Sequence, residues 1–465
     1  MSRLIASLVC GIFMIGLFWL DRENKPRPSA ALWIPVAWFL VACSRPVSRW
    51  FTSVSGDIRT MTAQVSDGSP MDRAVLTGLL FLGLIVLLNR RRRVTECLSE
   101  SIPILLFFGY CLVSLMWSDY PGVGFKRWNK AVGDWVMILI IWTEAHPVHS
   151  LKRVLARTTY TLIPLSILFM KYFPEFGRTY GRWMGEVHYC GVTTDKNALG
   201  AICLLFGIAA VWRMLGLFGE ECGKGRNNQR LMVQCVIIAL ILWLFSMLDS
   251  VTSLSCFLLA AGVLFAIRFR IVSRNPMMIH GVVLVTLMVP VTVTLLGASP
   301  ELLHAMGRNS TLTERTDIWQ MVIRLTPNRW IGTGYESFWL GPRLDTMVAN
   351  VTHWWVPNQS HNGYLEIYAN LGWVGVGCLA VVLLWGYRKV IRALRQNLPA
   401  SNLMLAYFLA GLIFNLTEAA FFRMMIPSWM FLLLAITQSR PKQPPTGLAR
   451  PRLWAASSSV PVNEL

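Results

Sequence analysis

Thirteen long apolar runs divide this sequence, and they constrain its fold more than any other feature. A helix that crosses a membrane needs about 20 mainly apolar residues, or somewhat fewer when its ends are polar. The runs lie at 4–20, 30–43, 74–89, 102–117, 131–144, 159–173, 197–218, 231–248, 252–267, 277–297, 365–387, 401–417 and 421–437. The second and fifth are short enough to be re-entrant segments. The sequence therefore predicts an all-α, polytopic membrane protein of about 12–13 transmembrane helices.

Composition favours a membrane protein over a soluble one. Hydrophobic residues make up 54% of the 465 residues and charged residues 14%, whereas a soluble domain has about 25% charged residues. The formal charge of +19 would suit a nucleic-acid partner only if Lys and Arg shared one face with base-stacking aromatic residues. Here they lie between apolar runs. The lipid bilayer is thus the expected surrounding, and no nucleic-acid partner is predicted.

The basic residues predict the orientation, because Lys and Arg are retained on the cytoplasmic side. The run Arg90-Arg91-Arg92-Arg93 follows the third apolar run and assigns that end to the inside, and later loops then alternate. The amino terminus would lie outside and the carboxyl terminus inside. The first run has no small-x-small cleavage site before Asp21, so it is expected to remain as a signal anchor.

This alternation divides the chain into four parts. Residues 1–297 are predicted to hold transmembrane helices 1–10, and residues 365–437 helices 11–13. Between them, 298–364 form one large outside loop, far longer than an ordinary connection. The end of the chain, 438–465, is rich in Pro, Ser and Arg without hydrophobic periodicity, and is predicted to be a disordered cytoplasmic tail.

The large loop is expected to be folded, because its many Trp, Tyr and Phe residues tend to pack. Thr313 is a candidate N-cap with acidic residues in the first turn after it, and Pro327 closes the pattern. An apolar stripe runs between them, formed by Ile318, Met321, Val322 and Leu325. The loop is therefore predicted to contain a helix that lies over the membrane face.

The most specific string, Pro357 to Gly375, follows this helix. Ser360 is predicted to cap a helix whose first residue is His361. Free N–H groups and the positive dipole end at a helix start favour anions, phosphates especially. A histidine here would lie beside an anion site at the water boundary. An interfacial histidine that only forms hydrogen bonds is the alternative.

Four strings stand out along the chain, namely HNGYLEIYANLGWVG, the earlier ERTDIW, NRWIGTGYESFW and TDKNALG. With them, the chain resembles the bacterial O-antigen ligase and O-antigen polymerase family over nearly its whole length. The amino-terminal ALWIPVAWFLVACSRPVSRW looks like the exopolysaccharide polymerase branch. The resemblance implies a GT-C-like fold with one large, partly helical periplasmic loop. It also implies a multi-pass protein of the bacterial inner membrane whose active face is periplasmic.

The resemblance implies an enzyme that transfers a glycan from undecaprenyl diphosphate to an acceptor hydroxyl. Polymerisation of lipid-linked repeat units into exopolysaccharide or O-antigen is the preferred reaction. The alternative is an O-antigen ligase that transfers the glycan to lipid A-core or to protein. A transporter is less favoured, because transport sites lie near the bilayer midplane, whereas ionisable residues here collect at the outside boundary. The expected partners are an undecaprenyl-diphosphate-linked oligosaccharide and proteins of polysaccharide export and chain-length control.

That chemistry predicts the site residues. A departing diphosphate needs cations, preferably arginine with its bidentate fork, and the acceptor hydroxyl needs a base near neutral pH. We expect His361 to be the base of an inverting transfer. The predicted catalytic residues are His361, Arg315 and Arg182, and the predicted substrate-binding residues are Arg178, Lys196, Asn362 and Tyr364. The sequence lacks Asp-x-Asp, His-Glu-x-x-His and clustered His/Cys motifs, so no metal or other cofactor is expected.

Three further residue groups near the outside boundary have structural interpretations. Glu418 and Arg423 flank the last outside turn and are predicted to form an ion pair with each other. Glu366 is expected to support the site without being catalytic. Gly372, Gly375 and Gly377 are expected to allow close helix packing.

Overall fold

A computed structural model describes most of the chain. The described residues are 2–22, 28–51, 69–180, 186–218, 224–248, 250–269, 271–272, 275–296, 311–352 and 356–438. Arg182, the first part of the predicted periplasmic loop (298–310) and nearly all of the predicted tail (439–465) lie outside these residues.

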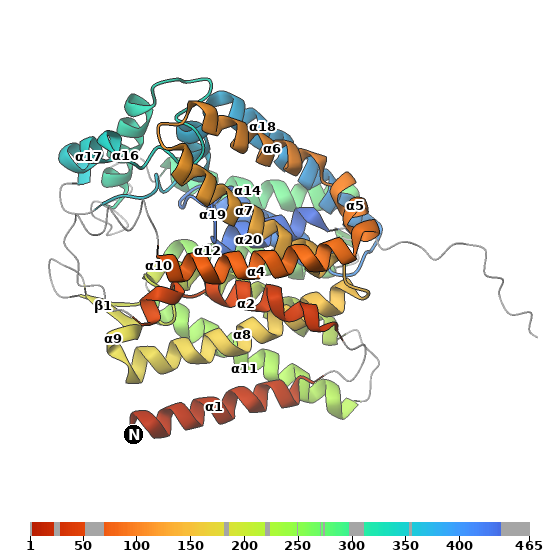
Figure 1. Ribbon diagram of the computed structural model, residues 1–465. Helices are drawn as coiled ribbons and strands as arrows, with labels where there is room; N and C mark the ends of the chain where they lie inside the picture. The colour runs from red at the N-terminus through yellow and green to blue at the C-terminus, as the bar shows by residue number, and fades with distance from the viewer. Residues whose placement is uncertain are drawn as a thin grey trace, which may run out of the picture.

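The described chain is almost entirely helical, as predicted (Figure 1). Its helices are α1 (Arg3–Leu20), η1 (Ala30–Leu32), α2 (Trp33–Ala42), η2 (Val47–Trp50), α4 (Pro70–Asn89), α5 (Arg91–Ser99), α6 (Ile102–Val113), η3 (Ser114–Trp117), α7 (Pro121–Trp142), α8 (Pro147–Tyr172), α9 (Pro174–Gly177), α10 (Lys196–Leu217), α11 (Lys224–Leu248), α12 (Val251–Arg268), α14 (Pro276–Leu296), α16 (Thr311–Leu325), α17 (Pro342–Met347), η4 (Val348–Thr352), α18 (Gly363–Arg395), α19 (Ser401–Phe414) and α20 (Pro427–Thr437). Two short antiparallel strands, β1 (Arg178–Tyr180) and β2 (Val187–Tyr189), place Thr179 opposite His188. Each predicted apolar run overlaps one of these helices or a consecutive pair, although the run 421–437 is helical only from Pro427.

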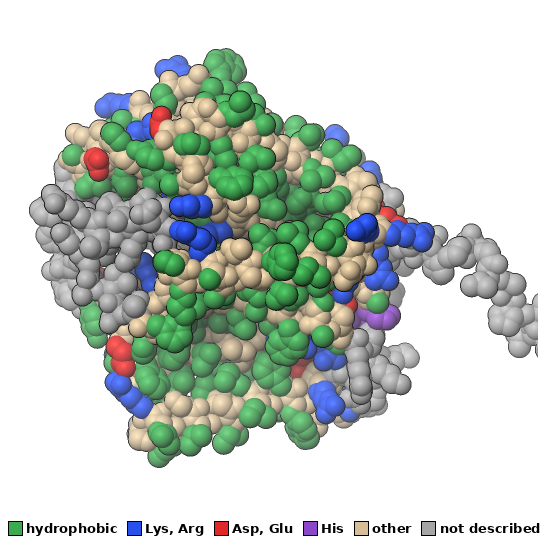
Figure 2. All heavy atoms as spheres, in the orientation of Figure 1, with side chains coloured by type: hydrophobic (Ala, Val, Ile, Leu, Met, Phe, Trp, Pro, Cys, Tyr) green, Lys and Arg blue, Asp and Glu red, His purple; other side chains and the backbone are tan. Residues whose placement is uncertain are grey.

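Six of the described helices are long and apolar enough to cross a membrane, namely α1, α4, α10, α11, α12 and α18. A seventh span results if the bent pair of α5 with α6 and η3 is taken as one. Shorter apolar helices, such as α2, α19 and α20, complete the bundle. Hydrophobic side chains cover much of the surface over the long helices (Figure 2). The all-α, polytopic membrane fold is confirmed, whereas the count of twelve or thirteen spans remains a prediction because it includes these shorter helices.

Ion pairs between distant segments hold the two ends of the bundle. At the end that carries α16 and β1 they include Arg3–Glu175 (2.8 Å) and Arg343–Asp119 (2.5 Å), and at the end that carries α5 they include Arg213–Asp21 (2.6 Å) and Lys389–Glu100 (3.8 Å). Each pair joins two segments that the predicted alternation assigns to the same side. We call these ends the α16 end and the α5 end. The basic run 90–93 lies at the α5 end (Figure 1).

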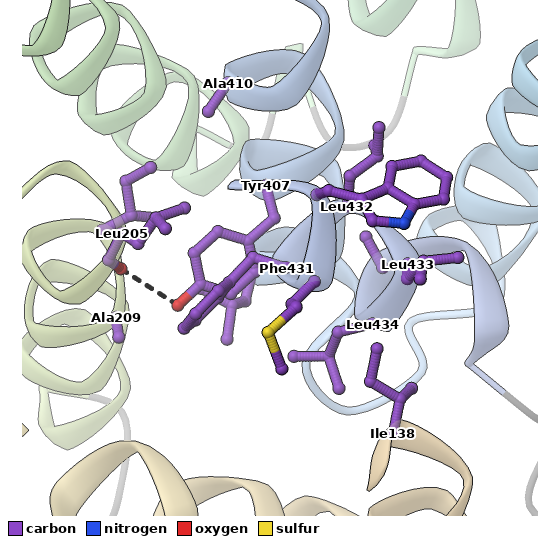
Figure 3. Packing of buried hydrophobic residues seen from close by; sticks show 14 of the residues in the cluster. Ile138, Leu205, Ala209, Tyr407, Ala410, Phe431, Leu432, Leu433 and Leu434 are labelled. Carbon is purple, nitrogen blue, oxygen red and sulfur yellow. Dashed lines mark hydrogen bonds between the residues drawn. The ribbon is translucent and has the colours of Figure 1, made fainter. Parts of the chain in front are cut away.

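Helices α10, α19 and α20 pack against one another in the core of the bundle. Tyr407 of α19 and Phe431 of α20 are fully buried side by side, with ring centroids 4.9 Å apart. The hydroxyl of Tyr407 donates to the carbonyl oxygen of Leu205 in α10 at 3.1 Å (Figure 3). This packing fixes α10, α19 and α20 against one another. The turn between α19 and α20, residues 415–426, therefore has a defined position beside the start of α10.

A second, smaller core lies under α16. Ile318 and Val322 are buried against Phe338, Trp339 and neighbouring apolar side chains. The predicted helix and its apolar stripe are therefore confirmed. The predicted start is wrong, since α16 begins at Thr311 and Thr313 lies inside it.

Candidate active site

His361 lies in the turn immediately before α18. The helix begins at Gly363, and its N-cap is Asn362, whose Oδ1 accepts from the amides of Tyr364 (3.0 Å) and Leu365 (3.1 Å). The predicted cap at Ser360, with His361 as the first helical residue, is therefore wrong. The shorter Ser360 side chain instead donates to the carbonyl oxygen of Asn362 at 2.8 Å.

The backbone of His361 is in the left-handed region, with a φ of 52°. This conformation is uncommon for a residue other than glycine, and it persists only where surrounding contacts hold it. Here the cap of α18 follows it directly, and the Ser360 amide before it donates to a carboxylate oxygen of Glu366 at 2.9 Å. The histidine ring thereby contacts Glu418 of the 415–426 turn.

Glu418 of that turn is the partner of His361. Its Oε2 lies 3.1 Å from Nδ1 of the histidine, and its carboxylate also accepts from Gln359 (2.9 Å) and Asn197 (3.1 Å). Arg315 of α16 lies 3.7 Å from Oε1. A carboxylate at Nδ1 favours the tautomer with the proton on that nitrogen, so Nε2 is the position that accepts a proton. The pair is arranged as a base with its orienting group.

Arg423 pairs with Glu336 rather than with Glu418, so the predicted Glu418–Arg423 ion pair is wrong. Oε1 of Glu336 lies 3.4 Å from Arg423, and Oε2 lies 3.4 Å from Arg127 of α7. Gln359 links the two groups, because its amide nitrogen donates to Glu418 and its oxygen accepts from Arg423 at 3.1 Å. Glu336, in the loop before α17, was missed by sequence reasoning because nothing in its local pattern marks it.

Two pKa directions follow from this environment. Burial alone lowers the pKa of the Arg423 guanidinium, but the carboxylates of Glu336 and Glu366 outweigh it, and the net pKa is raised. Burial raises the pKa of the Tyr335 hydroxyl, which donates to the carbonyl oxygen of Phe422 at 2.5 Å. Both groups therefore stay protonated at neutral pH, so Arg423 is a permanent cation of the site.

Buried polar contacts hold the 415–426 turn in place. Oδ1 of Asn415 accepts from the amides of Ala420 and Phe421, and its carbonyl oxygen accepts from Gly363 at 2.8 Å. Asp134 of α7, fully buried, accepts from the amide of Met425 at 2.9 Å. Contacts within the turn, together with Gly363 and Asp134 outside it, thus hold its geometry, which positions Glu418 and Arg423.

A cavity of about 720 Å³ opens beside His361 and Glu418. This volume lies in the range of small-molecule sites. The charged residues that line it, among those described, are Arg49, Lys130, Arg423, Asp72, Asp195 and Glu418. We call it the His361 cavity. It lies at the α16 end of the bundle.

The structure brings some of the predicted site residues together. His361 and Arg315 share Glu418, as given above, and Lys196 is the first residue of α10, next to the cavity-lining Asn197. Arg178 lies on β1, where its Nε donates to the carbonyl oxygen of Met170 at 2.8 Å.

Asn362 and Tyr364 have structural contacts. The first caps α18, and the hydroxyl of the second donates to the carbonyl oxygen of Leu412 at 3.3 Å. Their predicted contact with substrate stays a prediction.

Glu366 forms buried hydrogen bonds with residues on either side of His361. Its buried carboxylate accepts from Trp339 Nε1 at 2.6 Å, from the Ser360 amide at 2.9 Å and from Asn370 at 3.2 Å. The carboxylate thus ties the loop before α17 to the start of α18, which is a supporting position. Among the described residues, no group of three or more His, Cys, Asp or Glu side chains is placed to hold a metal ion.

Two similarities to known proteins follow from the sequence. Residues 235–380 match the model of a family described as O-antigen ligase, and this range includes Arg315, Glu336 and His361. The chain is also 22% identical over 341 residues to the exopolysaccharide production protein ExoQ of Rhizobium meliloti (strain 1021), covering 72% of this chain and 75% of that protein. The chain thus resembles O-antigen ligase-like proteins over part of its length, and its apolar helices agree with a multi-pass membrane protein.

Proposed function

We propose that this polysaccharide-related membrane enzyme polymerises undecaprenyl-diphosphate-linked repeat units into exopolysaccharide or O-antigen at the periplasmic face of the bacterial inner membrane. The observation that carries the proposal is the His361–Glu418 pair, 3.1 Å apart, in the wall of the His361 cavity. The basic run 90–93 lies at the opposite end of the bundle. Since basic residues are retained in the cytoplasm, this arrangement supports a site on the periplasmic side.

The residues suit an inverting, metal-independent glycosyl transfer. The acceptor hydroxyl oxygen attacks the anomeric carbon of the donor and forms the new glycosidic bond. The bond from that carbon to the diphosphate oxygen breaks, and its electron pair leaves with the diphosphate. Nε2 of His361 takes the hydroxyl proton, and Glu418 stabilises the imidazolium that results. Arg315, and by prediction Arg182, Arg178 and Lys196, would offset the charge of the departing diphosphate.

A polymerase and a ligase differ in the acceptor to which the glycan is transferred. The relative's printed name, an exopolysaccharide production protein, supports polymerisation. Transfer to lipid A-core is the alternative, supported by the description of the matching family as O-antigen ligase.

Purified protein supplied with a defined undecaprenyl-diphosphate oligosaccharide tests the proposed reaction. We expect products of two and more repeat units, released undecaprenyl diphosphate, and no loss of rate with a chelator. A sample that releases no diphosphate would contradict glycosyl transfer. Product that forms only when lipid A-core is added would identify a ligase.

Replacing Glu418 with Gln tests the orienting role of the carboxylate. The amide can no longer stabilise the imidazolium, so we expect kcat to fall about 10- to 100-fold with little change in KM. Glu175→Gln is the matched control, since Glu175 lies at the same end in an exposed pair with Arg3, and it should leave the rate unchanged. Wild-type turnover in the Glu418 variant would remove the carboxylate from the mechanism.

A further inference from the structure

A second cavity, of about 520 Å³, lies between the beginnings of α4 and α7. We call it the α4–α7 cavity. It shares part of its wall with the His361 cavity, namely Pro46, Leu76, Lys130, Asn358, Arg423 and Met424. Two spaces that share a wall can hold two ligands whose ends approach each other. The α4–α7 cavity has no part in the transfer step described above.

The two cavities differ in charge. Among the described residues, the His361 cavity is lined by as many carboxylates as Lys and Arg side chains. The α4–α7 cavity is lined by Arg73, Lys126, Arg127, Lys130 and Arg423 against a single carboxylate, Glu336. Figure 2 shows Lys and Arg side chains gathered between the beginnings of α4 and α7. An anionic ligand is therefore attracted to the α4–α7 cavity more strongly than to its neighbour.

The position of these cations disfavours a purely structural role. Lys126, Arg127 and Lys130 lie in the first three turns of α7, whose first turn has no acidic residue. All three side chains line one cavity, so their like charges repel one another. Arg127 is held by Glu336, whereas Lys126 and Lys130 crowd further positive charge onto the same end. A bound polyanion would offset this repulsion.

Beyond Arg73, the α4 side of the α4–α7 cavity is mostly apolar. Leu76, Thr77 and Leu80 line it, and further along the same helix Phe81, Leu84 and Leu88 are exposed. The cationic part of the α4–α7 cavity is thus continuous along α4 with an exposed apolar surface. Apolar helix surfaces of this kind face lipid in membrane proteins. A ligand with a polyanionic head and a long apolar chain matches both features.

We propose that the α4–α7 cavity binds the diphosphate of a second lipid-linked substrate, the glycan acceptor. This inference rests on the proposed polymerase function, because joining two lipid-linked glycans brings two diphosphates to one enzyme. The donor diphosphate is bonded to the reacting carbon and lies in the His361 cavity near Arg315. The acceptor reacts through a hydroxyl at the far end of its glycan, so its diphosphate needs a separate cationic site. Because the two cavities are adjacent at Arg423, a glycan that extends from the α4–α7 cavity would end close to His361.

Native mass spectrometry of the full-length protein with undecaprenyl diphosphate alone tests the inference. We expect two molecules to bind to the wild type and to His361→Ala, and one to Lys126→Gln/Lys130→Gln, whose second affinity should fall about tenfold or more. The control Arg91→Gln/Arg92→Gln removes two cations of α5 at the opposite end and should still bind two. A wild type that binds one molecule, or a Lys126/Lys130 variant that binds two with unchanged affinity, overturns the proposal.

Excess phosphatidylglycerol distinguishes the acceptor diphosphate from an ordinary lipid headgroup. We expect the second undecaprenyl diphosphate to remain bound in the presence of excess phosphatidylglycerol. Its displacement by phosphatidylglycerol at equal concentration would overturn the assignment.

A kinetic experiment compares the acceptor oligosaccharide with and without its lipid diphosphate. The Lys126/Lys130 variant should raise KM about tenfold for the lipid-linked acceptor only; an equal rise for both acceptors contradicts the inference. Full polymerisation by His361→Ala would refute the proposed function and leave the binding stoichiometry standing.

Discussion

His361→Ala is expected to abolish glycan transfer while the protein remains folded in the membrane. The variant removes the group that takes the acceptor proton, and such groups contribute about 10²- to 10⁴-fold to the rate. The ring is about one-fifth exposed and borders the His361 cavity, so its loss leaves little unfilled space in the core. We therefore expect kcat to fall by at least about 100-fold, with a melting temperature close to that of the wild type.

The rate of undecaprenyl diphosphate release by purified protein measures this effect. His188→Ala is the matched control, because His188 lies on β2 at the same end of the bundle and pairs with Thr179 in the strand register. It should leave the rate within about twofold of the wild type. Polymer of normal amount and length from cells that carry only the His361 variant would exclude the histidine as the base.

The helices were predictable from the sequence because each one requires only a local property. An apolar run between charged segments suffices to indicate a span such as α10 or α18, and the stripe of α16 was visible in its spacing. Exact helix starts were less predictable. At the start of α18, Ser360 and Asn362 are both good capping residues, and Asn362 prevails because its side chain reaches two amides at once.

The site was predictable only in part, because its contacts join distant segments. His361 could be found from its string, but its partner Glu418 lies 57 residues further along the chain. Because Glu418 and Arg423 are close in sequence, they were predicted to pair with each other. In the fold, Arg423 instead pairs with Glu336 from the loop before α17. Lys126 and Lys130 received no role from the sequence, where they stand just before the apolar run 131–144. The contact partners of His361 and Arg423 lie far from them in sequence, and only tertiary packing brings them together.

Gly372→Ala is expected to destabilise the protein by about 3 kcal/mol or more, the largest effect among single methyl additions in α18. Gly372 was expected to serve close helix packing, but it interrupts the helix, with φ 64° and ψ −166°. That backbone conformation is essentially restricted to glycine. An added Cβ would lie 2.2 Å from the carbonyl carbon of Trp330 and 2.4 Å from the amide of Ile331. The overlap involves backbone, so no side-chain rotation relieves it.

The interruption at Gly372 matters for the site because the preceding loop binds to it. The amides of Trp373 and Val374 donate to the carbonyl oxygens of Arg329 (2.9 Å) and Trp330 (3.0 Å). That loop continues directly into Glu336, which holds Arg127 and Arg423. Displacing the loop should therefore lower activity as well as stability.

Thermal unfolding in detergent, measured beside Gly377→Ala, separates this effect from the ordinary consequence of adding a methyl group. Gly377 lies five residues further along α18, and a Cβ there meets nothing within 4 Å. Since alanine is the better helix former by about 0.5–1 kcal/mol, Gly377→Ala should match or slightly exceed the wild-type melting temperature. Equal melting temperatures for the two variants would mean that α18 runs unbroken through Gly372, and that the loop carrying Glu336 is held by other contacts.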